Sequence, residues 1–372
     1  MFYHFENKKG WMNDPNGLVW YKGKYHAFFQ HYPYAPRWGQ MHWGHATSTD
    51  LIHWEEHDIA LFPDKDYEND GGCFSGSAIV KDDRLYLFYT SVSHELGQTQ
   101  SMAYSDDGFT FTKYEGNPII PRSPLGDNKD FRDPKVFRYE DEYRMIVGAG
   151  IYNIAKLLLF KSTDLINWEY IGELMSDGRF GGVAECPDLF QLDDKWVLMF
   201  SSVKALPHRV CFATGEFDGT TFEPDMPMKE VHGQKVPSDD PYFPVETGPD
   251  FYAPQTFEDS DGRRILIAWM YNWSRKSPSG QTHVGAFTIP RQIELSVRDE
   301  LLMFPVEEAC GLLKKESPFV FYERGLLKVV YENKTILERP FAEEPELQIL
   351  EDVGVVEIFI NGGREVITTY IC

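Results

Sequence analysis

Long apolar runs and paired cysteines are missing from this sequence of 372 residues. The longest apolar run covers only residues 265–271, whereas a membrane-spanning helix needs about 18 or more such residues. Residues 1–9 lack the basic-then-apolar order of a secretory signal peptide. The five cysteines are odd in number and scattered, without a Cys-x-x-Cys pair. We therefore expect reduced thiols, no membrane span and a cytoplasmic location.

Positive charge is also scarce in this chain. Lys and Arg number 36 against 58 Asp and Glu, which gives a formal net charge of −22 at pH 7 with His neutral. A surface of this sign repels the phosphates of nucleic acids and the anionic headgroups of membranes. We therefore expect neither nucleic acid nor a membrane as a partner. Hydrophobic residues make up 42% of the chain, which excludes a disordered protein.

Two short units recur along most of the chain. The first is a polar turn followed by an alternating apolar strand, and its strands recur at steps of 60, 58, 53 and 68 residues. Each strand begins directly after its turn, at Tyr25, Leu85, Tyr143, Trp196 and Arg264. The second unit opens with Ser-x-Asp and recurs at steps of 57, at residues 48–55, 105–111 and 162–169. Its Ser and Asp side chains are expected to bond to nearby backbone groups in a turn, which an aromatic residue pins to the sheet.

These repeats predict the fold class. Short strands with tight turns and no helical period predict an all-β protein. Repeats of about 50–60 residues are typical of a β-propeller, and five copies predict five blades. The alternative is a pair of β-sandwiches whose segments resemble one another by chance. Beyond the repeats, alternating strands indicate a small β domain docked on the propeller. We expect a five-bladed β-propeller at residues 1–295 and a shortened C-terminal β-sandwich at 296–372.

Polar and acidic residues recur just before the inner strands of the repeats. Asp14, Asp133 and Glu185 occupy such points, and residues 74–77 occupy the corresponding point of the second repeat. Since these strands line the axis of a propeller, we expect the carboxylates to converge in one funnel. Crowding and burial should raise the pKa of at least one of them and leave another ionised, as a glycosidase requires. We expect Arg132 to hold the Asp133 carboxylate ionised and oriented.

Structural roles are the alternative for these and other residues. Arg132 and Asp133 can form a buried ion pair between two blades, and Glu185 can be an exposed turn residue. Asp250 is interpreted as a cap or turn residue. The histidines match no strong zinc signature, so we interpret them as strand and pocket residues; they are His42, His45 and His53.

Four motifs stand in order along the chain: WMNDPNG at 11–17, FSGSA at 74–78, FRDP at 131–134 and ECPD at 185–188. In order and spacing they resemble glycoside hydrolase family 32, which holds invertases, sucrose-6-phosphate hydrolases and exo-acting fructan hydrolases. Further support comes from three segments: MHWGH at 41–45, TIPR at 288–291 and VEIFING at 356–362. The resemblance implies a five-bladed propeller followed by a β-sandwich.

The resemblance also implies a role for each carboxylate. Asp14 matches the family's nucleophile, which attacks C2 of a terminal β-fructofuranosyl unit. Glu185 matches the acid/base, and Asp133 matches the stabiliser of the transition state. The implied mechanism is retaining, through a covalent fructosyl-enzyme, so we expect the Asp14 and Glu185 carboxyls about 5–5.5 Å apart. No metal or cofactor is implied. The implied fructose pocket is formed by Asn13, Gln30, Trp38, Phe74, Ser75 and Arg132.

Two segments depart from the pattern of the family. The C-terminal domain is about half the usual length, so its sandwich is either incomplete or completed by a partner chain that covers its open edges; we expect a homodimer of the second kind. The Asn-Trp pair in the loop at 269–276 resembles the invertase and fructan-hydrolase branches, and we expect Trp273 to bind substrate.

Taken together, the residues and the resemblance predict a retaining β-fructofuranosidase. Its expected substrate is a small sugar, either sucrose or a short fructo-oligosaccharide, from which it hydrolyses the terminal β-D-fructofuranosyl residue. Sucrose-6-phosphate hydrolase, exo-levanase and exo-inulinase activities stay open as alternatives. An arabinan-acting five-bladed glycosidase would be inverting, with carboxyls about 6.5–9.5 Å apart. A non-catalytic sugar-binding propeller is disfavoured because all three carboxylates are present.

Overall fold

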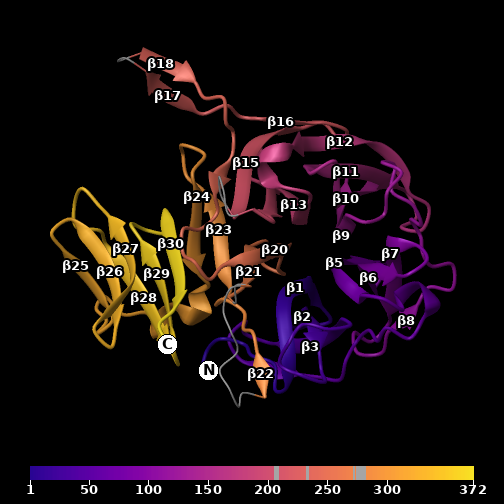
Figure 1. Cartoon of the computed structure of the whole chain (residues 1–372), viewed down its shortest axis with the longest axis horizontal. Coiled ribbons are helices and arrows are strands. Elements are labelled where there is room, and N and C mark those ends of the chain that lie inside the picture. Colours follow the sequence, from indigo (N-terminus) through magenta and orange to yellow (C-terminus); the bar gives the residue numbers. More distant parts are fainter. Residues whose placement is uncertain (205–208, 232–233, 271–272, 274–281) are drawn as a thin grey trace.

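The structure is a computed structural model that describes residues 1–204, 209–231, 234–270, 273 and 282–372. β-strands form nearly all of its regular structure, which confirms the all-β prediction (Figure 1). Its helices are short 3-10 turns: η1 (Asp66–Glu68), η2 (Gly178–Phe180) and η3 (Glu307–Leu312). In the ranges described, no helix combines the length and the apolar character that crossing a membrane would need.

The larger part of the chain forms antiparallel sheets of four or five strands, built in sequence order. The first two sheets consist of β1 (Gly10–Tyr21), β2 (Lys24–Tyr32), β3 (His42–Ser48) and β4 (Trp54–Glu56), then β5 (Gly72–Lys81), β6 (Arg84–Ser93), β7 (Gly97–Ser105) and β8 (Thr112–Lys113). The next two consist of β9 (Phe131–Tyr139), β10 (Glu142–Ile151), β11 (Ile154–Ser162) and β12 (Glu169–Asp177), then β13 (Ala184–Leu192), β14 (Lys195–Ser202), β15 (Val210–Phe217) and β16 (Phe222–Pro224), with β19 (Phe243–Pro244) against β15. The sheet that follows them consists of β20 (Tyr252–Glu258), β21 (Arg264–Trp269), β23 (Arg291–Leu295) and β24 (Leu301–Pro305).

These sheets lie around a common centre, with β1, β5, β9, β13 and β20 nearest to it (Figure 1). Each of these strands contacts the next one in the series, and β20 in turn contacts β1. The ring is also tied by β22 (His283–Val284), which pairs in parallel with β1 at Gly10 and Trp11. A hairpin of β17 (Met228–Val231) and β18 (Gln234–Pro237) extends away from the ring. The ring therefore brings residues that lie far apart in the sequence to one central region.

The repeated turns seen in the sequence have the conformations that their residues favour. Tight hairpins need left-handed backbone that matches the twist of the strands. Asp82 and Asp83, between β5 and β6, have φ values of 53° and 60°. Lys22 and Gly23, between β1 and β2, have φ values of 48° and 79°. The polar turns thus set the register of each hairpin.

The Ser-x-Asp units form the expected turns. The Asp50 carboxylate accepts backbone hydrogen bonds from Ile52 (3.0 Å) and His53 (2.8 Å), and Asp107 and Asp164 do the same in the next two sheets. The aromatic pin is also present, since the indole N–H of Trp54 donates to the Leu51 carbonyl oxygen at 2.9 Å. The prediction of a side-chain-capped turn in this unit is confirmed.

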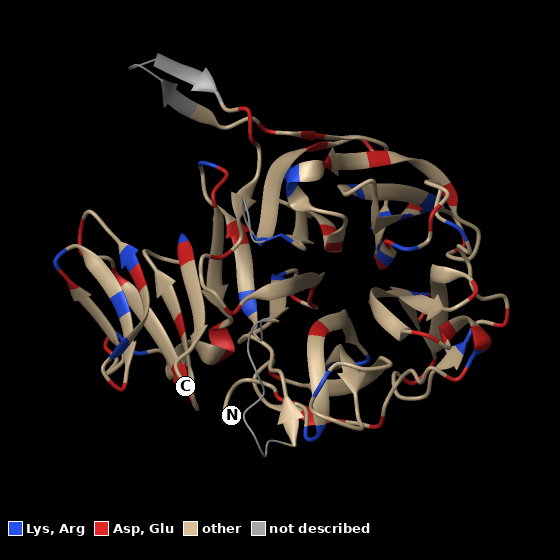
Figure 2. Cartoon of the chain, viewed as in Figure 1, with Lys and Arg blue, Asp and Glu red and all other residues tan. Residues whose placement is uncertain are grey.

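The C-terminal region packs a pair of three-stranded sheets against each other. The first consists of β25 (Val320–Glu323), β26 (Leu326–Tyr331) and β27 (Lys334–Pro340), and the second of β28 (Leu347–Asp352), β29 (Val355–Ile360) and β30 (Glu365–Tyr370). Apolar side chains from both sheets, such as Val329 and Ile358, form one buried cluster between them. Figure 2 shows acidic residues on these sheets and throughout the ring, with basic residues interspersed.

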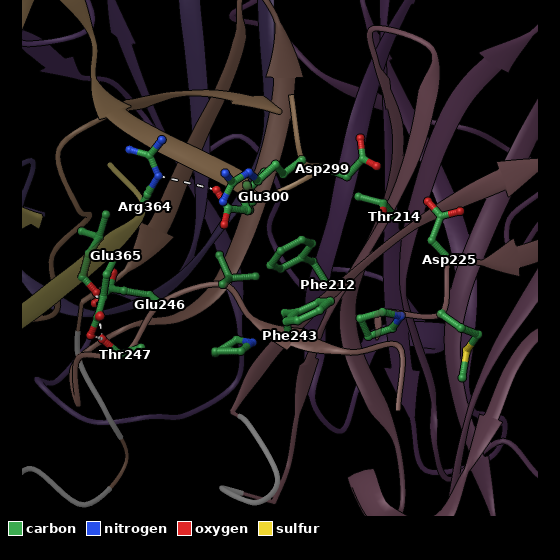
Figure 3. A pocket seen from close by; sticks show the side chains of 17 residues that line it. Phe212, Thr214, Asp225, Phe243, Glu246, Thr247, Asp299, Glu300, Arg364 and Glu365 are labelled. Carbon is green, nitrogen blue, oxygen red and sulfur yellow. Dashed lines mark hydrogen bonds and ion pairs between the residues drawn. The ribbon is translucent and has the colours of Figure 1, made fainter. Parts of the chain in front are cut away.

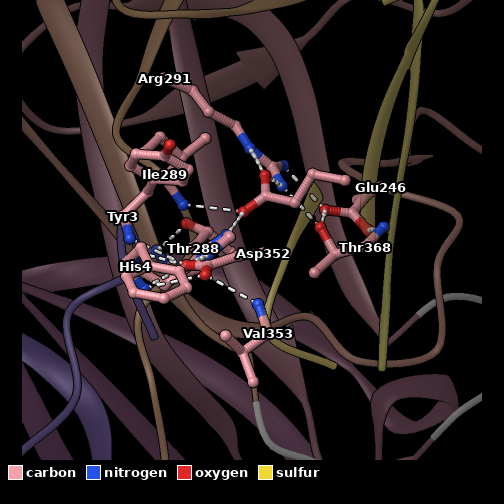
Figure 4. Close-up of polar contacts among 12 residues, drawn as sticks. Tyr3, His4, Glu246, Thr288, Ile289, Arg291, Asp352, Val353 and Thr368 are labelled. Atoms are coloured by element: carbon pink, nitrogen blue, oxygen red, sulfur yellow. Dashed lines mark hydrogen bonds and ion pairs between the residues drawn. The ribbon is translucent and has the colours of Figure 1, made fainter. Parts of the chain in front are cut away.

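A buried polar network joins this region to the ring (Figure 4). The Arg291 guanidinium forms ion pairs with Glu246 (2.8 Å) and with Glu357 of β29 (2.7 Å), and all three side chains are buried. The other oxygen of the Glu357 carboxylate lies 2.8 Å from Nε2 of His4, whose Nδ1 lies 2.9 Å from Asp352. Burying these charges is tolerable because each has partners of opposite sign. The network therefore makes docking of the C-terminal sheets depend on charge.

Raising the pH should weaken this junction. Burial by itself lowers the pKa of His4, but its hydrogen bonds to Asp352 and Glu357 outweigh burial and raise the pKa to about 9. The stabilisation by protonated His4 is complete below the unfolded pKa near 6.5 and is lost as the pH rises through about 9. The loss is of the order of 3 kcal/mol. Thermal unfolding between pH 6 and pH 10 measures it. Glutamine does not titrate, so in His4→Gln the free energy of unfolding should fall less steeply with pH. Equal slopes of this free energy against pH in both proteins would contradict the assignment.

Candidate active site

A β-bulge interrupts β1, β5, β9, β13 and β20 at corresponding points. The pairing with the next strand shifts between Met12 and Pro15, Phe74 and Gly76, Glu185 and Asp188, and Tyr252 and Gln255. In β9 the shift lies opposite Ile146 and Gly148. Asp133 and Cys186, inside their bulges, have left-handed φ values of 64° and 45°. A proline with no N–H to donate follows each of them, and such bulges redirect side chains.

The Asp14 carboxylate is held from two sides. The Ser75 hydroxyl of β5 donates to Oδ2 at 2.6 Å, and the Asn13 side-chain amide donates to Oδ1 at 3.0 Å. Asn13 is itself oriented by the indole N–H of Trp11, which donates to its Oδ1 at 2.7 Å. These donors favour the ionised carboxylate and fix the direction in which its oxygens face.

The Cys186 thiol lies between two carboxylates. Its Sγ is 3.5 Å from Oδ2 of Asp14 and 3.7 Å from Oδ2 of Asp133, and its backbone N–H donates to the same Asp133 oxygen at 2.9 Å. Burial, together with the charges of Asp14 and Asp133, raises the pKa of this thiol well above its ordinary value. Cys186 therefore stays protonated and brings β1, β9 and β13 together at one point.

Glu185 adjoins this point and is held by charged and neutral donors. Arg132 of β9 donates to Oε1 from Nη2 at 2.7 Å and from Nε at 3.1 Å. The Tyr252 hydroxyl of β20 donates to Oε2 at 2.5 Å. Burial and the negative charge of Glu185 raise the pKa of Tyr252 well above its ordinary value, so the hydroxyl keeps its proton. The site thus draws on β1, β5, β9, β13 and β20.

Like charges and burial shift the pKa values of the aspartates. Burial raises the pKa of Asp14, and Glu185 adds to the rise, while Ser75 and Asn13 oppose it. Burial raises the pKa of Asp133 to about 7; Arg132 opposes this shift, and the charges of Glu185 and Asp14 add to it. The expectation that crowding raises at least one carboxyl pKa agrees with these shifts. Such a cluster can hold a proton and a negative charge side by side.

The sequence-based interpretation of Arg132 was wrong in its partner. We expected this side chain to orient the neighbouring Asp133 carboxylate, but its hydrogen bonds go to Glu185, Asp130 and Gln98. The bulge explains the difference, because successive residues at a bulge project in different directions. The positive charge still opposes the rise in the pKa of Asp133, but orientation of Asp133 comes from Cys186.

The remaining pocket candidates occupy different depths. Gln30 is buried on β2, and its amide donates to the Cys73 carbonyl oxygen at 2.9 Å. Trp38 is 44% exposed and meets the Phe74 ring edge-on at 6.1 Å. Trp273 is 56% exposed and stacks on Trp11 at 5.5 Å. Phe74 adjoins Ser75, and Trp11 contacts Asn13, so these rings border the carboxylates.

Asp250 does not join the cluster. Its Oδ2 accepts the backbone N–H of Tyr370 at 2.9 Å and lies 3.3 Å from the Thr369 hydroxyl, so it holds β30 against the ring. A structural role was the preferred interpretation, and this contact agrees with it.

Sequence reasoning missed Tyr252 and Cys186. A signal was present: Asn13, Arg132, Glu185 and Tyr252 each stand two positions before a proline. Aligned on that proline, Tyr252 takes the place of Glu185 in the next repeat. The conserved phase of the repeats could therefore have placed the Tyr252 hydroxyl at the centre.

A separate cavity of about 480 Å³ lies between β15, the β23–β24 turn and β30 (Figure 3). The rings of Phe212 and Phe243 form part of its wall, and Arg364 and Glu300, which also line it, pair at 3.5 Å. Its described lining contains no member of the carboxylate cluster. The cluster, not this cavity, therefore defines the candidate active site.

The family follows from comparison with known proteins. A family model described as the N-terminal domain of glycosyl hydrolases family 32 matches residues 4–305. The chain belongs to glycoside hydrolase family 32. A levanase from Bacillus subtilis is 39% identical over 339 residues, which cover 82% of this chain and 46% of the levanase. A sucrose-6-phosphate hydrolase from Zymomonas mobilis is 37% identical over 345 residues, which cover 85% of this chain and 63% of that enzyme.

A solved structure from the same family shares the architecture of this chain. It is a variant of a β-fructofuranosidase from Bombyx mori in complex with sucrose, with a TM-score of 0.83 and 27% identity. The likeness covers 100% of this chain and 88% of the silkworm protein. In sequence, by contrast, the chain spans 46% and 63% of the length of the two relatives above. The family resemblance seen in the motifs is confirmed.

Removing the Tyr252 hydroxyl should impair this family 32 site without unfolding it. Tyr252→Phe leaves Oε2 of Glu185 without its 2.5 Å donor and keeps the packed ring. A lost hydrogen bond to a charged group is worth about 1.5–3 kcal/mol, so kcat of a reaction that depends on Glu185 should fall roughly 10- to 100-fold. Steady-state kinetics measure the fall in kcat, and thermal unfolding checks that the variant is folded. A kcat within twofold of the parent would show that Arg132 alone orients Glu185.

Proposed function

We propose that this chain is a retaining β-fructofuranosidase that releases the terminal β-D-fructofuranosyl residue of sucrose or short fructo-oligosaccharides. One observation carries the proposal: the Cys186 thiol contacts both Asp14 and Asp133, directly beside Glu185. Retaining glycosidases use a nucleophilic carboxylate and an acid/base carboxyl, and we assign these roles to Asp14 and Glu185, which meet in this cluster. The sucrose bound by the Bombyx mori relative supports a fructoside substrate.

The chemistry begins with Asp14. Its carboxylate attacks C2 of the fructosyl unit as the bond from C2 to the leaving oxygen breaks, and protonated Glu185 gives its proton to that oxygen. Water then attacks C2 of the fructosyl-enzyme, Glu185 takes a proton from it, and Asp14 is released. The Tyr252 hydroxyl can either donate to Glu185 or accept from it, so it serves both protonation states. We propose that Asp133 holds fructose hydroxyls, and its raised pKa makes donation as well as acceptance available.

The architecture suits this role. We propose that the sheets around the centre are the blades of a five-bladed β-propeller. The predicted domains were 1–295 and 296–372, but β24 pairs with β23 in a sheet of the ring, so we propose that the first domain extends to Pro305. The homodimer through the C-terminal domain and the cytoplasmic location stay predictions; a monomer in sedimentation at micromolar concentration would remove the first.

A product assay tests the function. Free fructose is measured after incubation with sucrose, sucrose 6-phosphate, an inulin-type chain and a levan-type chain. Release from at least one of them is expected, and proton NMR of the first-formed sugar should show retention at the anomeric carbon. Net inversion would reject the Asp14 nucleophile. Binding of a fructoside without turnover would favour a sugar-binding module instead.

A further inference from the structure

Large aromatic surfaces are exposed beside the carboxylate cluster. Tyr34 is 70% exposed, Phe62 is 49% exposed and Trp38 is 44% exposed. Single exposed apolar residues are ordinary on protein surfaces, but a contiguous set marks an interaction site. Trp38 already belongs to the proposed fructose pocket, whereas Tyr34 and Phe62 have no part in it.

Tyr34 and Phe62 form one patch through a buried ring between them. His42 lies edge-on to Tyr34 at 5.7 Å and to Phe62 at 5.8 Å. The His42 side chain is buried, and its Nδ1 lies 3.0 Å from the Gln40 carbonyl oxygen, so it is fixed. Tyr32 extends the set, with its ring 5.4 Å from that of Tyr34. We call Tyr34 and Phe62, held by His42, the aromatic patch.

Strand register places the aromatic patch at the same end of the sheets as Asp14. Trp11, three residues before Asp14, pairs with Tyr32, which ends β2. Met41, the residue just before β3, bridges to Gly72, two residues before Phe74. With about 3.4 Å per residue along a strand and 4.8 Å between strands, the aromatic patch lies roughly 10–15 Å from Asp14.

The segment that carries Phe62 is held in place. The Lys113 ammonium donates to the Phe62 carbonyl oxygen, to Asp64 at 2.7 Å and to Glu68 at 2.5 Å. Glu68 is fully buried, and its other oxygen accepts the Tyr89 hydroxyl at 2.7 Å. An aromatic surface fixed before the ligand arrives costs little entropy on binding.

We propose that Tyr34 and Phe62 bind, by stacking on sugar rings, the units of a neutral fructo-oligosaccharide that lie beyond the two nearest to Asp14. The inference rests on the proposed function and adds that chains of three or more units gain binding energy that sucrose does not. Aromatic faces suit the C–H surfaces of sugars, while the hydroxyl edges stay in water. Sucrose has only two units, so a sucrose bound at Asp14 has no further unit to offer the aromatic patch.

The test compares chain lengths. For Tyr34→Ala and Phe62→Ala, kcat/KM is measured on sucrose and on fructo-oligosaccharides of three, four and five units. The ratio of the value for the four-unit chain to that for sucrose should fall roughly fivefold in each variant, mainly through KM. Tyr170 is an exposed tyrosine near the start of β12, outside the aromatic patch. Tyr170→Ala should therefore keep the parent ratio. Tyr34→Trp keeps an aromatic ring at this position, so it should keep the parent ratio that Tyr34→Ala loses.

The outcomes separate the two proposals. A ratio that stays at the parent value in both alanine variants overturns the aromatic patch and leaves the fructosidase function intact. An equal loss on sucrose and on longer chains also overturns it, because the residues then act on the pocket itself. A parent protein that turns over no fructoside of any length overturns the proposed function instead. Thermal unfolding of each variant confirms that the exposed substitutions leave the fold in place.

Discussion

Asp14→Asn is expected to abolish fructoside hydrolysis, lowering kcat by about 10⁴- to 10⁶-fold, as removal of a covalent nucleophile does elsewhere. Asparagine has the size of aspartate and can accept the Ser75 hydroxyl bond, so packing changes little. It carries no negative charge with which to attack C2, so the covalent intermediate does not form. Steady-state release of fructose from sucrose measures the loss.

The control for this variant is another aspartate. Asp261→Asn alters an exposed turn between β20 and β21 and should leave kcat within twofold of the parent. If Asp14→Asn still binds fructose and keeps more than one per cent of the parent kcat, the nucleophile is another residue. Circular dichroism and thermal unfolding should show the same fold in both variants.

Glu185→Gln should lower kcat on sucrose by about 10²- to 10⁴-fold, the usual contribution of a general acid and base. The amide can still accept from Arg132 or Tyr252 but cannot transfer a proton. With a fructoside whose leaving group needs no protonation, the rate of the first step should fall much less in Glu185→Gln than it does with sucrose. Its fructosyl-enzyme should then accumulate and be visible as a hexosyl adduct in intact mass spectrometry.

Azide supplies a second readout for Glu185→Gln. This small anion can attack the fructosyl-enzyme without a general base, so it should raise turnover of the activated substrate in the variant and not in the parent. Glu216→Gln, on β15 of the same sheet and exposed, is the matched control and should behave as the parent. If Glu185→Gln slows activated and unactivated substrates by the same factor, the acid lies elsewhere.

Local chemistry explains why much of the fold could be predicted. The Ser-x-Asp turn needs only residues within four positions, and the bonds from Asp50 to the following backbone form as expected. The hairpin at Asp82 and Asp83 likewise depends on residues that tolerate left-handed backbone. Interactions of such short range depend only on residues that are close together in the sequence. The all-β fold and its repeats could therefore be predicted from the sequence.

The partners of side chains across the centre could not be predicted in the same way. Arg132 and Glu185 are 53 positions apart, and Tyr252 is 67 positions beyond Glu185. Which neighbour a long side chain reaches depends on the direction that a bulge imposes, and this direction follows from strand pairing. Arg132 was therefore assigned the wrong carboxylate, and Cys186 was expected only to be a reduced thiol.

The sequence by itself determined the all-β fold, the repeated turns and the family, and it singled out the three carboxylates that the structure brings together, because these depend on short-range patterns and on ordered motifs. Tertiary structure alone decided that Cys186 joins Asp14 to Asp133, that Tyr252 and Arg132 share Glu185, and that Tyr34 and Phe62 form one surface. The reason is physical: hydrogen bonds and ring contacts depend on distances of a few ångströms, which only the packing of separate sheets defines.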